Sequence, residues 1–139
     1  MATGVFDIIH PGHIYYLEEA KKLGDELIVI VARDKTVRNR KREPVIEEKQ
    51  RLEVVKALKP VDEAFLGSEK DIFDSVKKIR PDIIALGPNQ DVNEEWLKKE
   101  LKKRGFDNIR IERIKKMKVS RLNSSHLIIE EILKKYKGV

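Results

Sequence analysis

Two histidines lie close together near the start of the chain, His10 and His13, separated by Pro11 and Gly12. Proline suits the first position of a helix, because the N–H that it lacks would find no partner there. His10 is therefore expected at the N-cap and His13 one turn inside the helix, with the two rings on one face. Free backbone N–H groups at a helix start attract anions, and imidazole N–H groups donate hydrogen bonds to phosphate oxygens. The pattern therefore predicts a phosphate-binding site.

The loop before this helix, here called the opening loop (residues 4–10), strengthens that interpretation. Gly4 and Gly12 lack the Cβ atoms that would hold the phosphates of a nucleotide away from the backbone. Solvated histidines and ordinary turn glycines are the plain alternative for a short motif of this kind. The whole string from Thr3 to His13 reads TGVFDIIHPGH, which is much more specific than two histidines alone.

This string resembles the nucleotidylyltransferase superfamily, whose members carry G-x-F-D-x-x-H-x-G-H at this place. The resemblance implies transfer of a nucleotidyl group from an NTP to a phosphorylated acceptor, with release of pyrophosphate. It implies catalytic roles for His10 and His13, and nucleotide binding by Thr3, Gly4, Val5, Phe6, Asp7 and Gly12. Asp7 orients either the loop or the acceptor on this interpretation. Val5 stands where Thr or Ser is common, so a hydroxyl contact is lost there.

Apolar patterns along the rest of the chain alternate between strand and helix. Helical spacing of apolar residues predicts helices, and short runs rich in Ile, Val and Leu predict buried strands. The expected helices cover residues 13–23, 47–58, 71–79, 93–104 and 125–136. The expected strands cover residues 1–4, 27–32, 64–66, 83–86 and 109–114, with a basic loop after the second strand. This order predicts one Rossmann-like α/β domain over residues 1–139, with a parallel five-stranded sheet between two helical layers.

Ligands of such sheets bind beyond the carboxyl ends of the strands, near the point where the strand order reverses. The opening loop, the basic loop after Ala32 and the loop at residues 87–90 are expected to meet there. The loop at residues 87–90 is where contacts that choose the nucleotide base are expected. Its candidate residues are Gly87, Asn89 and Gln90.

The resemblance also assigns cationic and hydroxyl groups to the phosphates. Arg51 is similar to a family arginine that reaches the phosphates of the acceptor or nucleotide, and an exposed helix arginine is its plain alternative. Lys41 and its neighbours Arg40 and Arg42 match a lysine loop that closes over the substrate, without a choice among the three. The run from Arg121 to Ser125 is similar to the family's R-T-x-G-I-S-T/S-T/S. Arg121, Ser124 and Ser125 would then hold the β- and γ-phosphates, although the two serines also suit ordinary N-caps.

The amino-acid composition excludes several kinds of site and several classes of protein. The chain has 139 residues, no cysteine, 39% charged residues and a net charge of +6. Disulfides, thiolate nucleophiles and cysteine-ligated zinc are therefore excluded. The longest apolar run is too short for a bilayer and no secretory signal is apparent, so a soluble, cytoplasmic protein without a membrane partner is expected. The scattered lysines and glutamates predict solvated helix faces.

The sequence leaves two alternatives for the nucleotide and the acceptor of this enzyme. Segments at residues 24–34, 58–62 and 81–90 resemble the archaeal FAD synthetase group, which implies ATP and FMN as substrates. Glycerol-3-phosphate cytidylyltransferases share the same motifs, so CTP with a polyol or sugar phosphate is the near alternative. Mg²⁺ or another divalent cation is implied by the NTP and no protein ligand set for a metal is visible. A basic nucleic-acid-binding domain is a distant alternative, and a homodimer is one option for assembly.

Overall fold

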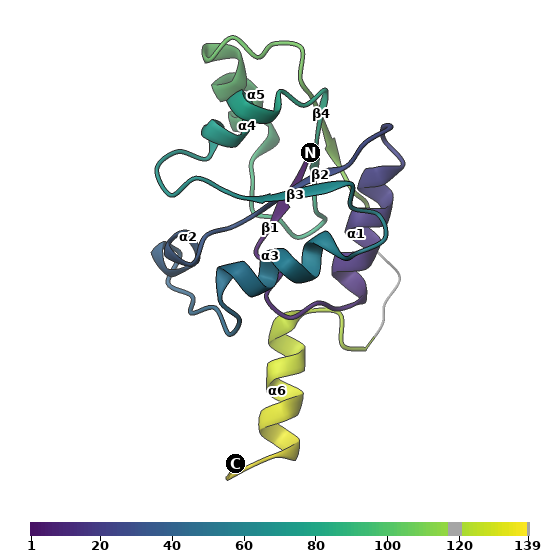
Figure 1. The fold of residues 1–139 in the computed structure, drawn as a ribbon, viewed down its shortest axis with the longest axis vertical. Coiled ribbons are helices and arrows are strands. Elements are labelled where there is room, and N and C mark those ends of the chain that lie inside the picture. Colours follow the sequence, from purple (N-terminus) through teal and green to yellow (C-terminus); the bar gives the residue numbers. More distant parts are fainter. Residues whose placement is uncertain (117–120, 139) are drawn as a thin grey trace.

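The computed structural model describes residues 1–116 and 121–138 (Figure 1). Its centre is a sheet of five strands: β1 (Ala2–Gly4), β2 (Ile28–Val31), β3 (Glu63–Leu66), β4 (Ile83–Leu86) and β5 (Arg110–Arg113). The strand order is β3-β2-β1-β4-β5, and every neighbouring pair is parallel. The predicted Rossmann-like parallel sheet is therefore confirmed. The order reverses between β1 and β4, which is where such sheets bind ligands.

Helices cover both faces of this sheet, and each pair of helices closes its own core. On one face, α1 (Pro11–Lys21) and α3 (Glu48–Lys56) pack side chains such as Leu17 and Val55 against β1 and β2. On the other face, α4 (Phe73–Ile79) and α5 (Glu94–Lys103) pack Phe73 and Leu101 against β4. Parallel strands buried in this way carry continuous apolar runs, as Ile28–Val31 does.

One short helix was not expected from the sequence. Residues 34–39, assigned to a basic loop, form α2 (Asp34–Asn39), so the loop proper begins only at Arg40. The carboxylates of Asp34 and Glu48 explain this helix, because each accepts a hydrogen bond from the backbone N–H of the other. The first residues of α2 and α3 thus cap each other across 14 residues of sequence, which a local pattern does not reveal.

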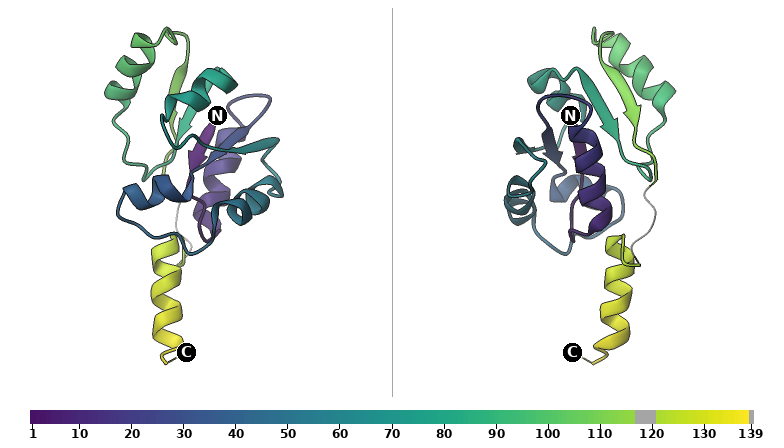
Figure 2. Two further views of the ribbon diagram at one scale, coloured as in Figure 1. Left: turned by 60° about the vertical axis from the view of Figure 1, so that its left-hand side comes forward. Right: turned by 90° about the vertical axis from the view of Figure 1, so that its right-hand side faces the viewer.

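The helix α6 (Ser125–Lys135) has a different setting from the others. It starts beside the opening loop and extends away from the sheet, with none of its side chains buried (Figures 1 and 2). Its N-cap is Ser124, whose hydroxyl accepts a hydrogen bond from the N–H of Leu127 at 3.1 Å. In residues 1–116 and 121–138, no helix is long and apolar enough to cross a membrane.

Candidate active site

The two histidines lie where the sequence predicts. His10 is the N-cap of α1, Pro11 is its first residue, and the Gly12 N–H donates to His10 Nδ1 at 3.0 Å. The His10 and His13 rings are stacked, with centroids 3.8 Å apart and an angle of 27° between their planes. Because the Nδ1 lone pair of His10 accepts the Gly12 N–H, a neutral His10 ring carries its proton on Nε2. Among the described residues no acceptor meets that Nε2–H, which lies at the start of a helix.

Both rings are held in the neutral form. Burial, and to a smaller extent the neighbouring His10, lower the pKa of His13 to about 3. Burial also lowers the pKa of His10 below its ordinary value. Two stacked cations would repel each other, so the pair acts near pH 7 as hydrogen-bond donors rather than as charges. His13 Nδ1 is buried without a partner among the described residues, and an unpaired acceptor costs less there than an unpaired N–H.

The glycines of the motif make room for the protein's own chain. A Cβ atom at Gly4 would lie 2.9 Å from the Phe6 ring, and one at Gly12 would lie 2.8 Å from the Asn123 carbonyl oxygen. From the sequence, the missing Cβ atoms of Gly4 and Gly12 were expected to make room for nucleotide phosphates alone. Phe6 is 2% exposed and sits at φ 54°, a strained left-handed conformation for a bulky residue. Its ring packs against Gly4 and His13, and the nucleotide contact expected of Phe6 stays a prediction.

Arg51 corrects the sequence interpretation most clearly. A phosphate contact was expected, but its guanidinium is buried and faces four acceptors of the protein. Nε donates to the Ile46 carbonyl, Nη1 to the carbonyls of Val5 and Ala32, and Nη2 to Asp34 Oδ1 at 2.6 Å. The physical reason is its place on α3, where it shares the inward face with Val55. Arg51 therefore links three segments: the opening loop at Val5, the residues from Ala32 to Asp34, and the segment before α3 at Ile46. This meeting point is here called the junction.

Asp7 binds at the same junction as Arg51, and it contacts the segment before α3. Its two carboxylate oxygens accept the backbone N–H groups of Val45 and Ile46 at 2.9 and 2.8 Å. Asp7 is 8% exposed, so it lies inside the junction rather than at its surface. Of the two roles considered for Asp7, this geometry fits orientation of the loop.

Asp34 completes the junction as the carboxylate partner of Arg51. Burial alone would raise the pKa of Asp34, but the hydrogen bonds from Arg51 and the Glu48 N–H outweigh it and hold the pKa below its ordinary value. The Glu48 pKa is also lowered, chiefly by the hydrogen bond from the backbone N–H of Asp34. Both groups stay ionised near neutral pH, so the buried guanidinium keeps a charged partner.

The loop at residues 87–90 meets the end of β1, directly before the opening loop. Gln90 Nε2 donates to the carbonyl and the hydroxyl oxygen of Thr3 at 2.9 and 3.2 Å, and its Oε1 accepts the Gly87 N–H at 2.8 Å. The Gln90 amide thus holds two backbones together, and Gly87 is buried between them. Asn89, in contrast, is exposed and free of these contacts. Asn89 and the backbone are therefore the groups of this loop that are available to contact a nucleotide base.

Arg113 is a residue that the sequence interpretation missed. It lies at the end of β5 and donates to the carbonyls of Gly87, Gln90 and Val92 at 2.8, 2.8 and 2.7 Å. Its Nε also pairs with Glu94 at 2.9 Å. One guanidinium therefore fixes the curve of the whole loop. Only its position at the carboxyl end of a predicted strand could have drawn attention to it.

The first residue of α6 also reaches the opening loop. Ser125 Oγ lies 3.2 Å from the Ile8 carbonyl, to which it donates, and 3.4 Å from the Ile8 N–H. The Ser124 hydroxyl oxygen, as the N-cap of α6, accepts a hydrogen bond from the Leu127 N–H. Arg121 is mostly exposed and pairs with Glu131 at 3.5 Å, along the helix rather than over the histidines. Lys41 is exposed at φ 59° and is not brought to the histidines either.

A family model described as cytidylyltransferase-like matches residues 1–131, with the stacked histidines inside it. This chain belongs to the cytidylyltransferase-like family. The cytidylyltransferase-like chain is 65% identical over 135 residues to the FAD synthase of Methanothermus fervidus, covering 95% of this chain and 92% of that one. It is 57% identical over 138 residues to the FAD synthase of Archaeoglobus fulgidus, with 99% of both chains covered.

A solved structure shares the fold of this cytidylyltransferase-like chain. The lipopolysaccharide core biosynthesis protein of Thermoplasma volcanium superposes with a TM-score of 0.83 and 50% sequence identity. The match covers 85% of this chain and 96% of that one. The family expected from the opening string is therefore confirmed, together with the fold.

Proposed function

We propose that this chain is an FMN adenylyltransferase, which joins ATP and FMN to form FAD and pyrophosphate. The identity to FAD synthases over nearly the whole chain supports this pair of substrates. The observation that carries the chemistry is the stack of neutral His10 and His13 at the start of α1, at the reversal point of the sheet. A donor pair of this kind suits a developing negative charge on phosphate oxygens.

The reaction is an in-line displacement at the α-phosphorus of ATP. A phosphate oxygen of FMN forms the new bond to this phosphorus, and the bond to the oxygen bridging the β-phosphorus breaks. The electron pair leaves with pyrophosphate. A phosphate is already ionised near neutral pH, so no general base is required and catalysis rests on positioning and charge stabilisation.

The residues divide into donors and supports in this proposal. His10 and His13 donate from Nε2 to the α-phosphate and the departing oxygen. The backbone of Gly4, Val5 and Gly12 lines the path of the triphosphate, and Thr3 holds the adjoining loop through Gln90. Arg51 and Asp7 act as positioning residues. Because the Val5–Phe6 peptide is planar and trans, the Arg51 bond to the Val5 carbonyl turns the Phe6 N–H away from Arg51.

The remaining candidates surround this centre. Ser124 and Ser125 lie at the start of α6, and their placement suits the β- and γ-phosphates. Arg121 and Lys41 are exposed cations that would add to the charge around the phosphates. The exposed Asn89 is the side chain of its loop that is free to meet the base.

Mg²⁺ enters this proposal as a companion of the ATP phosphates. Among residues 1–116 and 121–138, no three His, Asp or Glu side chains are grouped as a metal site. Both Asp7 oxygens accept backbone N–H groups, and His10 Nδ1 is occupied by Gly12. The donor set of the chain therefore does not fit a resident metal, and the phosphate oxygens would supply the ligands.

A substrate matrix tests this function. ATP and CTP are each combined with FMN, glycerol 3-phosphate and a sugar phosphate, and pyrophosphate release is measured together with chromatography of the product. We expect rapid release with ATP and FMN only, and a product that elutes as FAD. Riboflavin, which lacks the attacking phosphate, is the matched control and gives no product. Rapid turnover of CTP with glycerol 3-phosphate, while ATP is inert, would replace this proposal by the cytidylyltransferase alternative.

A further inference from the structure

Tyr16 lies on α1, three residues after His13, and its side chain is buried against the sheet. Its hydroxyl accepts the N–H of Thr3 at 3.2 Å and donates to the carbonyl oxygen of Ala85 at 2.6 Å. The Thr3 carbonyl oxygen, 3.4 Å away, is the more distant of the two acceptors within its reach. One side chain of the helix that carries the histidines therefore bonds to β1 and to β4 at once.

These two strands have little direct pairing at the point where the strand order reverses. β1 and β4 are in register at a single pair, Ala2 with Ala85, whereas β1 and β2 are in register at three pairs. Beyond that single pair, the Tyr16 hydroxyl and the Gln90 amide bridge the two strands and the loop that follows β4. Sheets of this kind bind ligands in the crevice at such a reversal point. The floor of that crevice is therefore built partly from side chains.

The surroundings of Tyr16 make it a support and not a group that touches substrate. Its side chain is 6% exposed, and a Cβ atom at Gly87 would lie 3.8 Å from its ring, which is ordinary van der Waals contact. Burial raises the pKa of Tyr16, so the hydroxyl keeps its proton near neutral pH and continues to donate to Ala85. Tyr16 therefore supports the first residue of the loop at residues 87–90 from within the protein.

Tyr16 is also the polar link between α1 and the strands. In residues 1–116 and 121–138, it carries the only hydrogen bonds that join α1 to β1 or β4. Leu17 and Ala20 add apolar contacts, which are not directional and allow small shifts of the helix. Hydrogen bonds weaken steeply as their angle departs from the preferred range, so they define both position and rotation. The start of α1, with both histidines, is therefore oriented through Tyr16.

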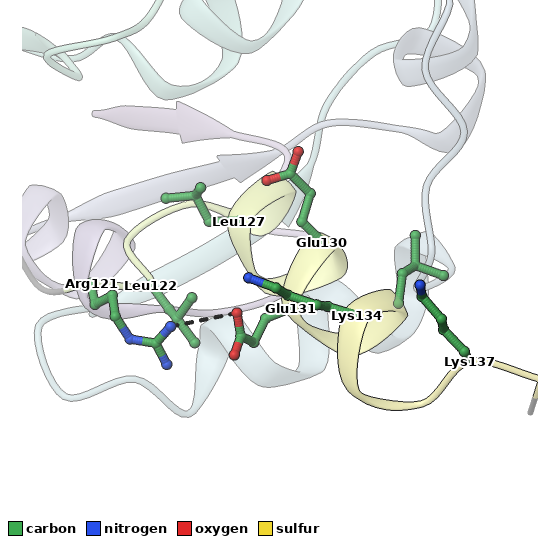
Figure 3. A pocket seen from close by; sticks show the side chains of 8 residues that line it. Arg121, Leu122, Leu127, Glu130, Glu131, Lys134 and Lys137 are labelled. Atoms are coloured by element: carbon green, nitrogen blue, oxygen red, sulfur yellow. Dashed lines mark ion pairs between the residues drawn. The ribbon is translucent and has the colours of Figure 1, made fainter.

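The chain around α6 supplies no equivalent link to α1. Figure 3 shows the groove beside α6, whose lining residues all lie between positions 121 and 137. Arg121 turns toward Glu131 there, at 3.5 Å. Ser125 bonds to Ile8, which belongs to the opening loop and not to α1. The orientation of α1 against the crevice therefore depends on its own contacts with the sheet.

We propose that Tyr16 is a positioning residue for nucleotidyl transfer, whose hydroxyl sets the histidine pair against the nucleotide in the crevice between β1 and β4. This role rests on the proposed function. Gln90 and Arg113 hold the loop at residues 87–90 without Tyr16, so the nucleotide should still bind when the hydroxyl is lost. A small rotation of α1 would instead misplace the donors, and a displacement of about 1 Å can cost about 100-fold in rate.

Removal of the single hydroxyl tests this role. Tyr16→Phe keeps the ring, and kcat for FAD formation should fall about 10-fold to 100-fold. KM for ATP should change by about threefold or less, because binding before the reaction is kept. Calorimetry with an ATP analogue that carries a methylene bridge between the α- and β-phosphorus should give an almost unchanged Kd. Tyr15→Phe is the matched control, because the Tyr15 hydroxyl bonds to neither β1 nor β4, and it should keep the wild-type kcat.

A loss of stability alone would not produce this split between kcat and KM. Val76→Ala removes two methyl groups from the core on the other face of the sheet, so it should lower the urea midpoint. Its kcat should equal that of the wild type at a temperature where circular dichroism shows both to be folded. Val76→Ala thus separates a general loss of stability from a specific loss of position.

A double-mutant cycle tests whether Tyr16 acts through the histidines. In a His10→Ala background, Tyr16→Phe should cost about threefold or less, because the donor that it positions is already absent. Equal losses in the two backgrounds would overturn the proposal. It is also overturned by a folded Tyr16→Phe variant with the wild-type kcat, by an equal loss in Tyr15→Phe, or by a loss confined to KM. A wild type that forms no FAD would instead overturn the proposed function.

Discussion

The Nη1 atom of Arg51 lies 2.7 Å from the carbonyl oxygen of Val5, so an arginine expected on phosphate instead holds the backbone of the opening loop. The same guanidinium reaches the end of β2 through Ala32 and the start of α2 through Asp34. Its loss would leave the Asp34 carboxylate and three carbonyls without their partner. Arg51 is thus a positioning residue, and its effects should appear in folding as well as in activity.

The first prediction concerns the stability that Arg51 provides. Arg51→Ala should lower the free energy of unfolding by about 3–5 kcal/mol, because it leaves three carbonyl oxygens without their donor and the half-buried Asp34 carboxylate without its cation. Arg51→Lys should recover only part of this loss, since a single ammonium cannot reach four acceptors. Urea unfolding followed by circular dichroism measures both. Arg38→Ala is the matched control, because its pair with Glu43 is exposed and should change stability by about 1 kcal/mol or less. An unchanged stability of Arg51→Ala would contradict this account of the junction.

The second prediction concerns the loop at residues 87–90. Arg113→Ala removes the three hydrogen bonds that curve this loop, so ATP should bind less well to a folded protein. We expect KM for ATP to rise about tenfold, equivalent to about 1.4 kcal/mol, with a smaller change in kcat. Steady-state kinetics with saturating FMN measures the split. Arg110→Ala on the same strand, whose exposed side chain pairs with Glu112, should behave like the wild type.

The third prediction concerns acid stability. An unfolded histidine gains a proton below about pH 6.5, whereas folded His13 gains one only near the lowered pKa of about 3. Between these values the unfolded chain binds more protons, so the free energy of unfolding rises with pH and is lost on acidification. Most of this window lies above the range in which the lowered pKa values of Asp34 and Glu48 matter.

Urea unfolding at several pH values between about 4 and about 7 measures that slope. His13→Gln should make the slope shallower, because the ring with the pKa of about 3 is gone while His10, whose pKa is also lowered, still contributes. Lys98→Gln, which changes an exposed side chain of α5, is the control and should leave the slope unchanged. An unchanged slope in His13→Gln would assign the acid sensitivity to other groups.

Local sequence patterns were sufficient to predict the order of strands and helices and the start of the first helix. The alternation of strands and helices follows from apolar spacing. The helix start at Pro11, with His10 and His13 on one face, follows from the needs of a helix end. The meeting of Gln90 with Thr3 at the end of β1 followed from parallel strand order. The roles assigned to Asn89, Lys41 and Arg121 on phosphate or base stay predictions.

Long-range pairing was beyond those patterns. Arg51 stands in a charged run that reads as an exposed helix, yet it is four residues before Val55 and shares the inward face with it. That spacing was the available signal for its burial. The helix α2 depends on Glu48, a residue 14 positions beyond its own start, and the loop at residues 87–90 depends on Arg113 from another strand. Such contacts appear only when the strands are assembled.

Transfer of label from ATP tests the central claim most directly, because it examines the reaction and the histidine pair together. ATP labelled at the α-phosphate is incubated with FMN, and the label is followed by chromatography. The wild type should move the label into FAD, and His10→Ala should lower the rate by about 100-fold to 1,000-fold while the protein stays folded. His126→Ala, in which an exposed histidine is lost, should keep the wild-type rate. Label in FAD at an undiminished rate from folded His10→Ala would contradict the account, as would a wild type that leaves all the label in ATP.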